Sequence, residues 1–309
     1  MIDLSIIIVS WNVRDLLRDC LRSIQQNVGD LSYEVIVVDS ASADDTPAMI
    51  QAQFPDVVVL AQTENVGFTR GNNIGLQAAQ GRHLFLLNPD TVILDNTLQQ
   101  MVTYLDEHPT VGIVGPHTLN TDGTHQSTRR RFPTVVLAFF ESTWLQPFAP
   151  KRLLDHFYAR DIADSAVAPV DWVQGSAMMA RREVYQQIGG LDTGFVMFSE
   201  EVDWCKRAQS AGWGTVYLGT ARIIHHGGKS TEQVAARKHI HFQQSKLRYF
   251  RKHHGMLAAG TLRVFLLANY VWQILLEGTK ALVGYKRPLR QERIRAYWQV
   301  LRSGLKVTR

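Results

Sequence analysis

Short apolar runs alternate with segments of helical periodicity along the first 115 residues of this 309-residue chain. Apolar runs of strand length occur at 4–9, 34–38, 57–61, 83–87 and 111–114. Between them, apolar residues at helical spacing occupy 14–27, 46–54, 69–80 and 96–108. Strands that alternate with helices in this way build a mostly parallel sheet with helices on both faces, so the pattern predicts an α/β fold.

Polar clusters directly follow several of these apolar runs. They are Ser10-Trp11-Asn12, Asp39-Ser40-Ala41-Ser42 and Asn88-Pro89-Asp90. The carboxyl ends of parallel strands meet at one edge of the sheet, where ligands bind in open α/β folds. A lone Asp at such a position can also be a turn former or a helix cap. Because the clusters coincide, we expect this edge to hold the functional site.

The segment 65–75 places glycines and asparagines at the start of a predicted helix. Small residues allow a ligand to approach the backbone, and the free N–H groups of a helix start favour phosphate. Close packing of the helix on the sheet through Gly71 and Gly75 explains the same spacing. Arg70 opposes the helix dipole unless it meets an anion, which can be a diphosphate or a structural carboxylate. The sequence lacks the dinucleotide and P-loop fingerprints, which disfavours a hydride-transfer enzyme.

Carboxylates cluster at Glu200, Glu201 and Asp203 in the second half of the chain. Their mutual repulsion raises the pKa of one of them unless a cation is shared, although they can equally be surface charge that compensates a helix dipole. Further on, His225-His226-Gly227-Gly228-Lys229-Ser230 offers an imidazole to a metal or a diphosphate. A buried structural histidine is the alternative.

An arginine-rich segment, Thr128-Arg129-Arg130-Arg131-Phe132-Pro133, precedes an aromatic-rich apolar stretch at 135–148. A core helix accounts for the stretch. Arginines followed by aromatic residues also suit an acceptor that carries a pyrophosphate and a lipid, so we expect a mobile flap on the acceptor side. Residues 172–182 then predict another strand that enters a helix.

The charge of the chain is divided unevenly. The net charge is +5, yet residues 222–309 hold 18 Lys and Arg against 3 Asp and Glu, a net charge of +15. Such a segment meets an anionic partner, either nucleic acid or the headgroups of the cytoplasmic leaflet. The tail shows no nucleic-acid-binding module and few aromatic residues beside its basic ones, so we expect no nucleic-acid partner.

Residues 257–283 predict one amphipathic helix with a wide apolar face. Arg263, Asn269, Gln273 and Glu277 interrupt it, which argues against a transmembrane span of about 20 apolar residues. We expect the helix to lie on an anionic membrane surface, with the basic residues of 286–295 beside it. A helical homodimer interface is the alternative, and both can hold together.

Composition indicates a folded protein, with 45% hydrophobic and 20% charged residues. Two cysteines, Cys20 and Cys205, are too few for a disulfide framework. Cys20 falls on the apolar face of a predicted helix, where we expect a buried thiol. The N-terminal apolar run is too short for a signal sequence. Together these features predict a reducing, cytoplasmic location.

A set of motifs, in this order, resembles a known family. The motifs are S-W-N, V-D-S-x-S, N-x-G-F-x-R-G-N-N, N-P-D, Q-G-S-x-M-x-x-R, E-E-x-D-W and H-x-G-G-x-S. They resemble glycosyltransferase family 2, and within it the bacterial rhamnosyltransferase-like branch. The resemblance implies a GT-A fold at 1–252, with a nucleotide-sugar half at 1–115 and an acceptor half at 116–252. Residues 253–309 would form a basic amphipathic helical extension.

The resemblance also implies a donor site. Asp39 would contact the nucleobase, and the backbone near Ser10 would lie beside it. The implied donor-binding residues are Ser10, Asp39, Asn65, Arg70, Asn72, Asn88 and Asp90. Asp90 matches the second carboxylate of the family's D-x-D motif, whereas Asn88 replaces the first. A Mg or Mn ion is therefore left to Asp90 and His225.

Glu201 occupies the position of the family's catalytic Asp, so the resemblance implies that it is the general base of a single displacement with inversion. Because the Glu side chain is longer, Glu200 and Asp203 are fallback candidates. The implied acceptor-side residues are Trp172, Gly175, Asp203, Trp204 and Arg130.

These inferences together predict an inverting, metal-dependent glycosyltransferase, peripheral on the inner face of the cytoplasmic membrane. We expect it to move a sugar, rhamnose from dTDP-rhamnose, to a cell-surface glycan or a polyprenyl-diphosphate-linked saccharide. A UDP-hexose donor is an alternative, because uracil and thymine present similar edges to an Asp. Since Asn88 and Glu201 depart from the family pattern, a noncatalytic nucleotide-sugar-binding scaffold is the other alternative.

Overall fold

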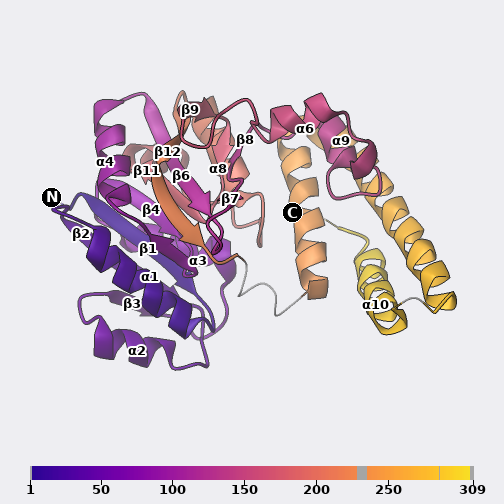
Figure 1. Ribbon diagram of the computed structural model, residues 1–309, viewed down its shortest axis with the longest axis horizontal. Coiled ribbons are helices and arrows are strands. Elements are labelled where there is room, and N and C mark those ends of the chain that lie inside the picture. Colours follow the sequence, from indigo (N-terminus) through magenta and orange to yellow (C-terminus); the bar gives the residue numbers. More distant parts are fainter. Residues whose placement is uncertain (1, 228–234, 285, 307–309) are drawn as a thin grey trace. The chain divides into compact units, whose positions relative to one another are not determined.

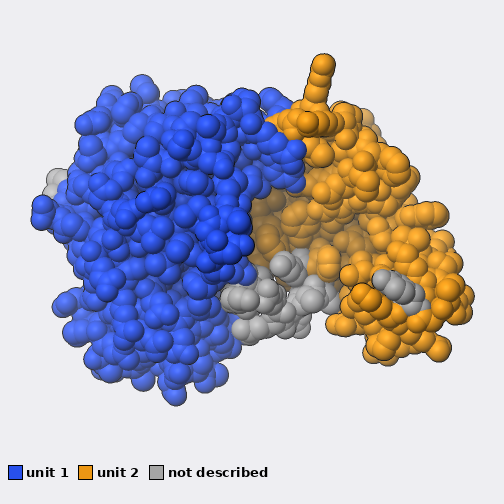
Figure 2. Space-filling model, in the orientation of Figure 1, with its two compact units in different colours: residues 1–132, 156–193, 200–230 blue, residues 133–155, 194–199, 231–309 orange. Residues whose placement is uncertain are grey.

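The computed structural model describes residues 2–227, 235–284 and 286–306. Three predicted positions of the H-x-G-G-x-S segment, Gly228, Lys229 and Ser230, lie outside the described residues. The chain forms two compact units (Figure 2). Unit 1 comprises 1–132, 156–193 and 200–230, and unit 2 comprises 133–155, 194–199 and 231–309. Each unit thus joins segments that are far apart in the sequence.

A ten-stranded sheet forms the centre of unit 1 (Figure 1). Its main path has the order β3-β2-β1-β4-β11-β6-β12-β5. These strands are β1 (Leu4–Ser10), β2 (Tyr33–Asp39), β3 (Val58–Ala61), β4 (His83–Leu87), β5 (Thr91–Ile93), β6 (Val111–Leu119), β11 (Ala177–Arg181) and β12 (Gly214–His225). Strands β1 to β4 pair in parallel, as do β6 and β12, while β11 runs antiparallel between β4 and β6. The prediction of a mostly parallel sheet is confirmed.

Four short strands complete the pairing. They are β7 (His125–Gln126) on β6, β9 (Val167–Val170) on β12, and β8 (Arg129–Arg130), which pairs with β10 (Trp172–Val173). The predicted strand at 172–182 is therefore two strands, β10 and β11, because β10 pairs with β8 in a separate small sheet.

Helices cover both faces of the sheet. They are α1 (Arg14–Asn27), α2 (Thr46–Gln53), α3 (Gly67–Ala78), α4 (Thr97–Glu107), α7 (Arg182–Ile188) and α8 (Glu200–Ser210). Side chains of α1, α2 and α4 build one core, and side chains of α3, α7 and α8 build the other. Alternation along β1 supplies both cores, since Ile6 and Ile8 enter the first and Ile7 enters the second. Cys20 is a buried free thiol, as predicted.

Unit 2 is helical. Its elements include α5 (Val135–Phe140), η1 (Gln146–Phe148), α9 (Ala235–Leu282) and α10 (Arg287–Ser303), and α6 (Lys151–Phe157) begins in it. The interpretation of 135–148 as one core helix is wrong in extent, because α5 ends at Phe140 and Ser142 has a left-handed φ of 61°. Lys246 Nζ lies 3.0 Å from Glu141 Oε2 and joins this segment to α9.

Helix α9 contains the predicted amphipathic helix and is interrupted at Gly255, whose φ is 88°. Helix α10 packs on α9, and a buried ion pair joins them, with Arg290 Nη1 2.7 Å from Glu277 Oε2. Within the described residues, His239–Leu282 has the length and apolar composition of a membrane span. The same helix carries the polar residues Arg263, Asn269, Gln273 and Glu277 that argue against a span, so a position on the membrane surface stays a prediction. Length and composition alone are weak evidence for a span.

Candidate active site

The carboxyl ends of β1 and β2 place two predicted donor-binding residues side by side. Ser10 pairs in register with Asp39, and both are buried. One carboxylate oxygen of Asp39 accepts a hydrogen bond from the N–H of Ser42 at 3.0 Å. Asp39 Oδ1 and the hydroxyls of Ser10 and Ser40 have no hydrogen-bond partner among the described residues. Because buried polar atoms are normally paired, this edge is suited to a polar ligand.

The predicted donor-binding residues near the start of α3 differ in how far they are exposed to solvent. Asn72 is buried, and its amide donates to Phe68 O within the helix. Asn65 and Arg70 are exposed. No carboxylate in the described part of the chain pairs with Arg70, so the structural pairing that the sequence left open is not formed there.

The glycines of α3 are explained by packing on β1. A Cβ on Gly71 would lie 2.7 Å from Val9 Cγ1, and one on Gly75 would clash with Ile7 Cγ2. Close packing, one of the two explanations that the sequence left open, therefore requires both glycines.

Asp90 and His225 meet at the same side of the sheet. His225 Nε2 lies 3.3 Å from Asp90 Oδ1 and 3.4 Å from Asn88 Nδ2. Asp90 and His225 are both buried, and the pairing of β5 with β12 places His225 opposite Thr91. Asp90 O also accepts a hydrogen bond from the N–H of His226 at 2.9 Å. The predicted metal-ligating pair is thus brought together by strand pairing.

The other ring nitrogen of His225 determines how the imidazole can bind a cation. Nδ1 lies 2.7 Å from Gln126 Oε1, so its N–H donates to this amide oxygen. Nε2 then presents a lone pair towards Asp90 Oδ1, and two acceptors 3.3 Å apart need a proton or a cation between them. A carboxylate, an imidazole and phosphate oxygens form a donor set that suits Mg or Mn. These residues therefore fit a divalent ion.

Gln126 is a site residue that the sequence did not reveal. It lies on β7, which has two residues and no periodic signal of its own. The pairing of Gln126 with Thr118 on β6 carries it to His225. The contact could be found only from the folded sheet.

A backbone contact connects the segment of Asn88 and Asp90 to the Q-G-S motif. The N–H of Asn88 donates to Ser176 O at 2.9 Å, where β11 begins beside β4. The preceding residue, Gly175, lies against Glu201, since a Cβ on it would be 3.4 Å from Glu201 Cβ. The segment 88–90, the Q-G-S motif and Glu201 are therefore successive neighbours.

The consecutive glutamates at the start of α8 have perturbed acidities. Burial, together with the negative charge of Glu201, raises the pKa of Glu200 well above 4.5. Burial also raises the pKa of Glu201, while backbone N–H groups, including that of Gly175, and the charge of Arg130 oppose the rise. One carboxylate oxygen of each glutamate has no hydrogen-bond partner among the described residues. Such a carboxylate is suited to accept a proton from a substrate.

Asp203 and Trp204, also predicted here, make structural contacts. Arg207 Nε donates to Asp203 Oδ2 at 2.8 Å, and both Asp203 and Trp204 are fully buried. The guanidinium of Arg207 and the indole of Trp204 donate to carbonyl oxygens of residues 188–190. These contacts fasten α8 to the end of α7, which makes Asp203 a weaker candidate for the base than Glu201.

Arg130 and Trp172, both predicted for the acceptor side, pair on β8 and β10, and the charge of Arg130 acts on Glu201. The guanidinium carbon of Arg130 lies 4.7 Å from the ring centroid of Tyr158 and 6.0 Å from that of Trp172. Its Nη1 donates to Ser127 Oγ at 2.7 Å. Strand pairing sets Trp172 opposite Arg130, so the cation and the aromatic rings are held together near the glutamate.

A second group of metal-ligating residue types, not predicted from the sequence, lies close to β7. Ligand atoms of His117, His125 and Asp164 are within 4.8 Å of one another. Arg129 Nη2, however, donates to Asp164 Oδ1 at 2.8 Å, and His125 Nδ1 lies 3.0 Å from His117 Nε2. A guanidinium already neutralises the carboxylate, so we interpret this group as a structural hydrogen-bond network.

Comparison with known proteins places the fold and the site in context. The family profile described as Glycosyl transferase family 2 matches residues 5–189. The chain is 27% identical over 208 residues, 64% of this chain and 67% of the relative, to N-acetylglucosaminyl-diphospho-decaprenol L-rhamnosyltransferase of Mycobacterium tuberculosis (strain CDC 1551 / Oshkosh). It is 25% identical over 258 residues, 80% of this chain and 92% of the relative, to Rhamnosyltransferase WbbL of Escherichia coli (strain K12).

A solved structure shares the fold. It is that of mannosyltransferase PcManGT from Pyrobaculum calidifontis in complex with GDP-Man and Mn2+. The TM-score is 0.56 at 19% identity, and the match covers 98% of this chain and 84% of the other. At this identity the likeness shows the fold alone.

Proposed function

Because this chain belongs to glycosyltransferase family 2 and has the GT-A fold, we propose that it is a metal-dependent, inverting rhamnosyltransferase of cell-surface glycan assembly. The predicted family, fold and enzyme class are confirmed. The choice of rhamnose is supported by the names of the Mycobacterium and Escherichia relatives. The observation that carries the proposal is the Asp90–His225 pair, which residues 175–176 connect to Glu201.

The donor nucleotide is proposed to bind where β1 and β2 end. Asp39 Oδ1 is buried without a hydrogen-bond partner among the described residues, so it can accept the N–H of a thymine or uracil ring. The hydroxyls of Ser10 and Ser40 lie on the same edge. We propose dTDP-rhamnose as donor. A UDP-hexose is the alternative, because both bases present the same N–H.

The diphosphate of the donor is proposed to meet Asp90, His225 and Arg70. A divalent ion bound by Asp90 and His225 would supply positive charge to the leaving diphosphate. Gln126 holds the His225 ring so that Nε2 faces the position of the ion. Arg70 is an exposed cation with no described carboxylate partner, so it can contact a phosphate oxygen.

Glu201 is proposed to take the proton from the acceptor hydroxyl. The hydroxyl oxygen forms a bond to the anomeric carbon while the bond from that carbon to the diphosphate breaks, so the configuration inverts. The raised pKa of Glu201 increases its basicity, while the charge of Arg130 opposes the rise and favours the ionised form. Burial and the charge of Glu201 raise the pKa of Glu200 well above 4.5, which favours its protonated form beside the base.

The acceptor is proposed to be a saccharide linked to a polyprenyl diphosphate. Arg130 with Tyr158 and Trp172 offers a cation next to aromatic faces, on which sugars and lipid diphosphates bind well. The Mycobacterium relative is named for an N-acetylglucosaminyl-diphospho-decaprenol acceptor. The predicted mobile flap on this side remains a proposal.

We propose that unit 2 holds the enzyme at the inner face of the cytoplasmic membrane. Large apolar side chains of α9 are exposed, at Val264, Val271, Trp272 and Leu275. Helix α10, which packs on α9, carries several basic residues, and these suit an anionic leaflet. A homodimer that covers the same apolar face is the alternative.

A transfer assay tests the proposal. The purified protein is incubated with dTDP-rhamnose, UDP-glucose or GDP-mannose, Mn2+ and a bacterial lipid extract, and the release of nucleoside diphosphate and the labelled lipid are measured. We expect turnover with dTDP-rhamnose. Nucleotide binding without turnover of any donor would support the noncatalytic scaffold instead.

A further inference from the structure

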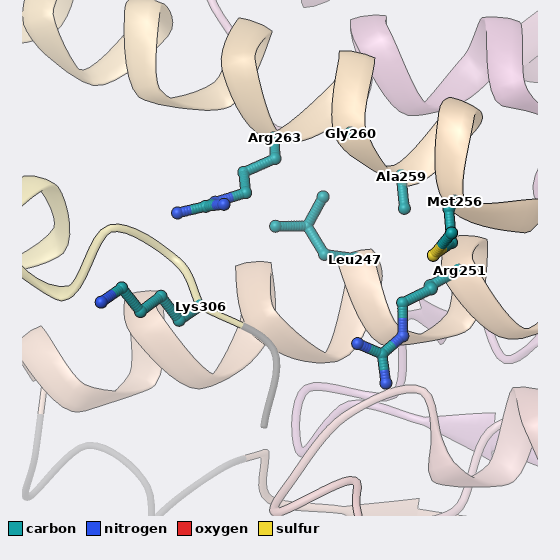
Figure 3. A pocket seen from close by; sticks show the side chains of 7 residues that line it. All are labelled: Leu247, Arg251, Met256, Ala259, Gly260, Arg263 and Lys306. Atoms are coloured by element: carbon teal, nitrogen blue, oxygen red, sulfur yellow. The ribbon is translucent and has the colours of Figure 1, made fainter. Parts of the chain in front are cut away.

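Unit 2 contains a cavity beside the kink of α9, and every described charged residue that lines it is a cation. It has a volume of about 440 Å3, and its charged lining residues are Arg251, Arg263 and Lys306. None of the described residues that line it is Asp or Glu. Figure 3 shows the three cationic side chains placed around Leu247. Like charges around one cavity repel each other unless an anion is shared.

Two buried cations of unit 2 differ from these because carboxylates neutralise them. Lys246 lies 3.0 Å from Glu141, and Arg290 lies 2.7 Å from Glu277. Around the cavity, Arg263 Nε instead donates to Gly304 O at 2.8 Å, which fixes the guanidinium in place. Arg251 and Lys306 carry no described ion pair. Arg251, Arg263 and Lys306 therefore form a cationic cluster that can bind an anion.

The surroundings of the cavity indicate an amphiphilic ligand. Met256, which lines the cavity, is 80% exposed, and the neighbouring Leu257 and Val264 are 83% and 69% exposed. Nearby on α9, Ala259 and Leu247 provide a buried apolar wall. An anion with an attached hydrocarbon chain satisfies both the cations and the exposed apolar side chains.

From these contacts we propose that the cavity binds the phosphate headgroup of a membrane lipid, with the hydrocarbon chain along the exposed side chains of α9. The inference rests on the membrane association proposed above and adds a defined headgroup site to it. Two sources share this chemistry, namely a glycerophospholipid of the leaflet and a polyprenyl phosphate carrier. Arginine and lysine both bind phosphate oxygens through charge-assisted hydrogen bonds.

Vesicle co-sedimentation of the full-length protein tests the site. The variant Arg251→Gln/Lys306→Gln removes two lining cations and keeps Arg263, which has a structural hydrogen bond. The control Arg295→Gln/Arg302→Gln removes the same charge from exposed positions of α10. We expect the lining variant to lose about tenfold more affinity for vesicles with phosphatidylglycerol than the control loses.

A charge-conserving variant, Arg251→Lys/Lys306→Arg, separates the geometry of the site from its charge. It should recover part of the lost affinity, and thermal unfolding of each variant checks that the fold is intact. Equal losses in the lining variant and the control would overturn the headgroup site while leaving membrane association in place. Failure of the unmodified protein to bind any vesicle would overturn both, yet would leave glycosyl transfer untouched.

The two lipid sources are distinguished by vesicles with equal surface charge. One set contains phosphatidylglycerol, and the other contains a polyprenyl phosphate. Tighter binding to the second set, lost in the lining variant, would identify the carrier lipid as the occupant. Equal binding that the lining variant loses would identify the leaflet headgroup, and both results support the site.

Discussion

At the scale of single residues, Glu201 carries the proposed chemistry, so its replacement gives the sharpest test. Glu201→Gln removes the proton acceptor and little volume. We expect kcat to fall by about 10²- to 10⁴-fold, with the affinity for dTDP unchanged, because the proposed donor contacts are at the ends of β1 and β2. Donor titration and initial rates measure the two effects separately.

The neighbouring residue is the matched control. Glu200→Gln should retain most of the activity, because the raised pKa of Glu200 favours a neutral carboxyl, which an amide resembles in charge. If instead Glu200→Gln abolished turnover and Glu201→Gln retained it, the two roles would be exchanged.

The acidity of Glu201 predicts the pH profile of the reaction. A general base acts only when deprotonated, and burial raises the pKa of Glu201 above 4.5. The rate should therefore fall as the pH is lowered through this raised pKa. A profile of kcat that stays flat down to the ordinary Glu value would contradict this environment.

Glu200 predicts how stability depends on pH. Because its pKa is raised well above 4.5 in the folded state, the folded state binds the proton more tightly than the unfolded state. Stability from this group is present below about pH 4.5 and is lost as the pH rises through the raised pKa. Glu200→Gln should thus raise the melting temperature at pH 8 and have little effect in acid. Equal shifts at both pH values would contradict the assignment.

The sequence predicted some site residues and missed others for identifiable reasons. Asp39 and His225 end strands, and Asp90 lies in the turn after β4, so their shared edge follows from parallel pairing. Gln126 lies on a two-residue strand that carries no pattern. Asp203 pairs with Arg207, which lies one helical turn away. The sequence spacing permits this ion pair but does not show that it forms, so the structural contact of Asp203 could not be predicted.

At the scale of elements, the glycines of α3 can be tested as packing residues. Gly75→Ala places a Cβ against Ile7 of β1, and we expect a loss of about 1–3 kcal/mol in the free energy of unfolding. Gly260→Ala on α9 is the control, because a Cβ there meets no atom within 4 Å. The control should be neutral or stabilising by up to about 1 kcal/mol, since Ala favours helix over Gly. Equal destabilisation in denaturant unfolding would show that packing is not the cause.

Helices and strands with strong hydrophobic periodicity could be predicted from the sequence. Those whose bounds depend on contacts with other elements could not. Helix α1 was predicted at its observed bounds because its apolar stripe is continuous. The stretch 135–148 is richer in apolar residues than α1, yet the left-handed Ser142 and contacts to α9 divide it. The antiparallel strand β11 also follows from its partners β4 and β6, which no local pattern specifies.

At the scale of the whole molecule, the uneven charge predicts how the protein leaves a membrane. If unit 2 binds the leaflet surface through basic residues, about 1 M salt should release the protein from membrane fractions, because the Debye length is then roughly 3 Å. A spanning α9 would keep the protein in the pellet. Salt extraction followed by immunodetection distinguishes the two arrangements.

The sequence did not predict which segments belong to each of the two compact units. Segments 133–155 and 194–199 belong to the unit of the C-terminal helices although they lie within the predicted catalytic part. Long-range contacts, such as Lys246 with Glu141, determine this division. The functional boundary at residue 252 therefore stays a prediction about activity.

The most direct test of the account is a calorimetric titration of dTDP, with and without Mn2+, into the protein and into Asp90→Asn. We predict that Mn2+ strengthens dTDP binding to the unmodified protein by about tenfold or more, and that Asp90→Asn loses this gain. Equal dTDP affinity with and without Mn2+ in the unmodified protein would contradict a metal-dependent donor site at Asp90 and His225.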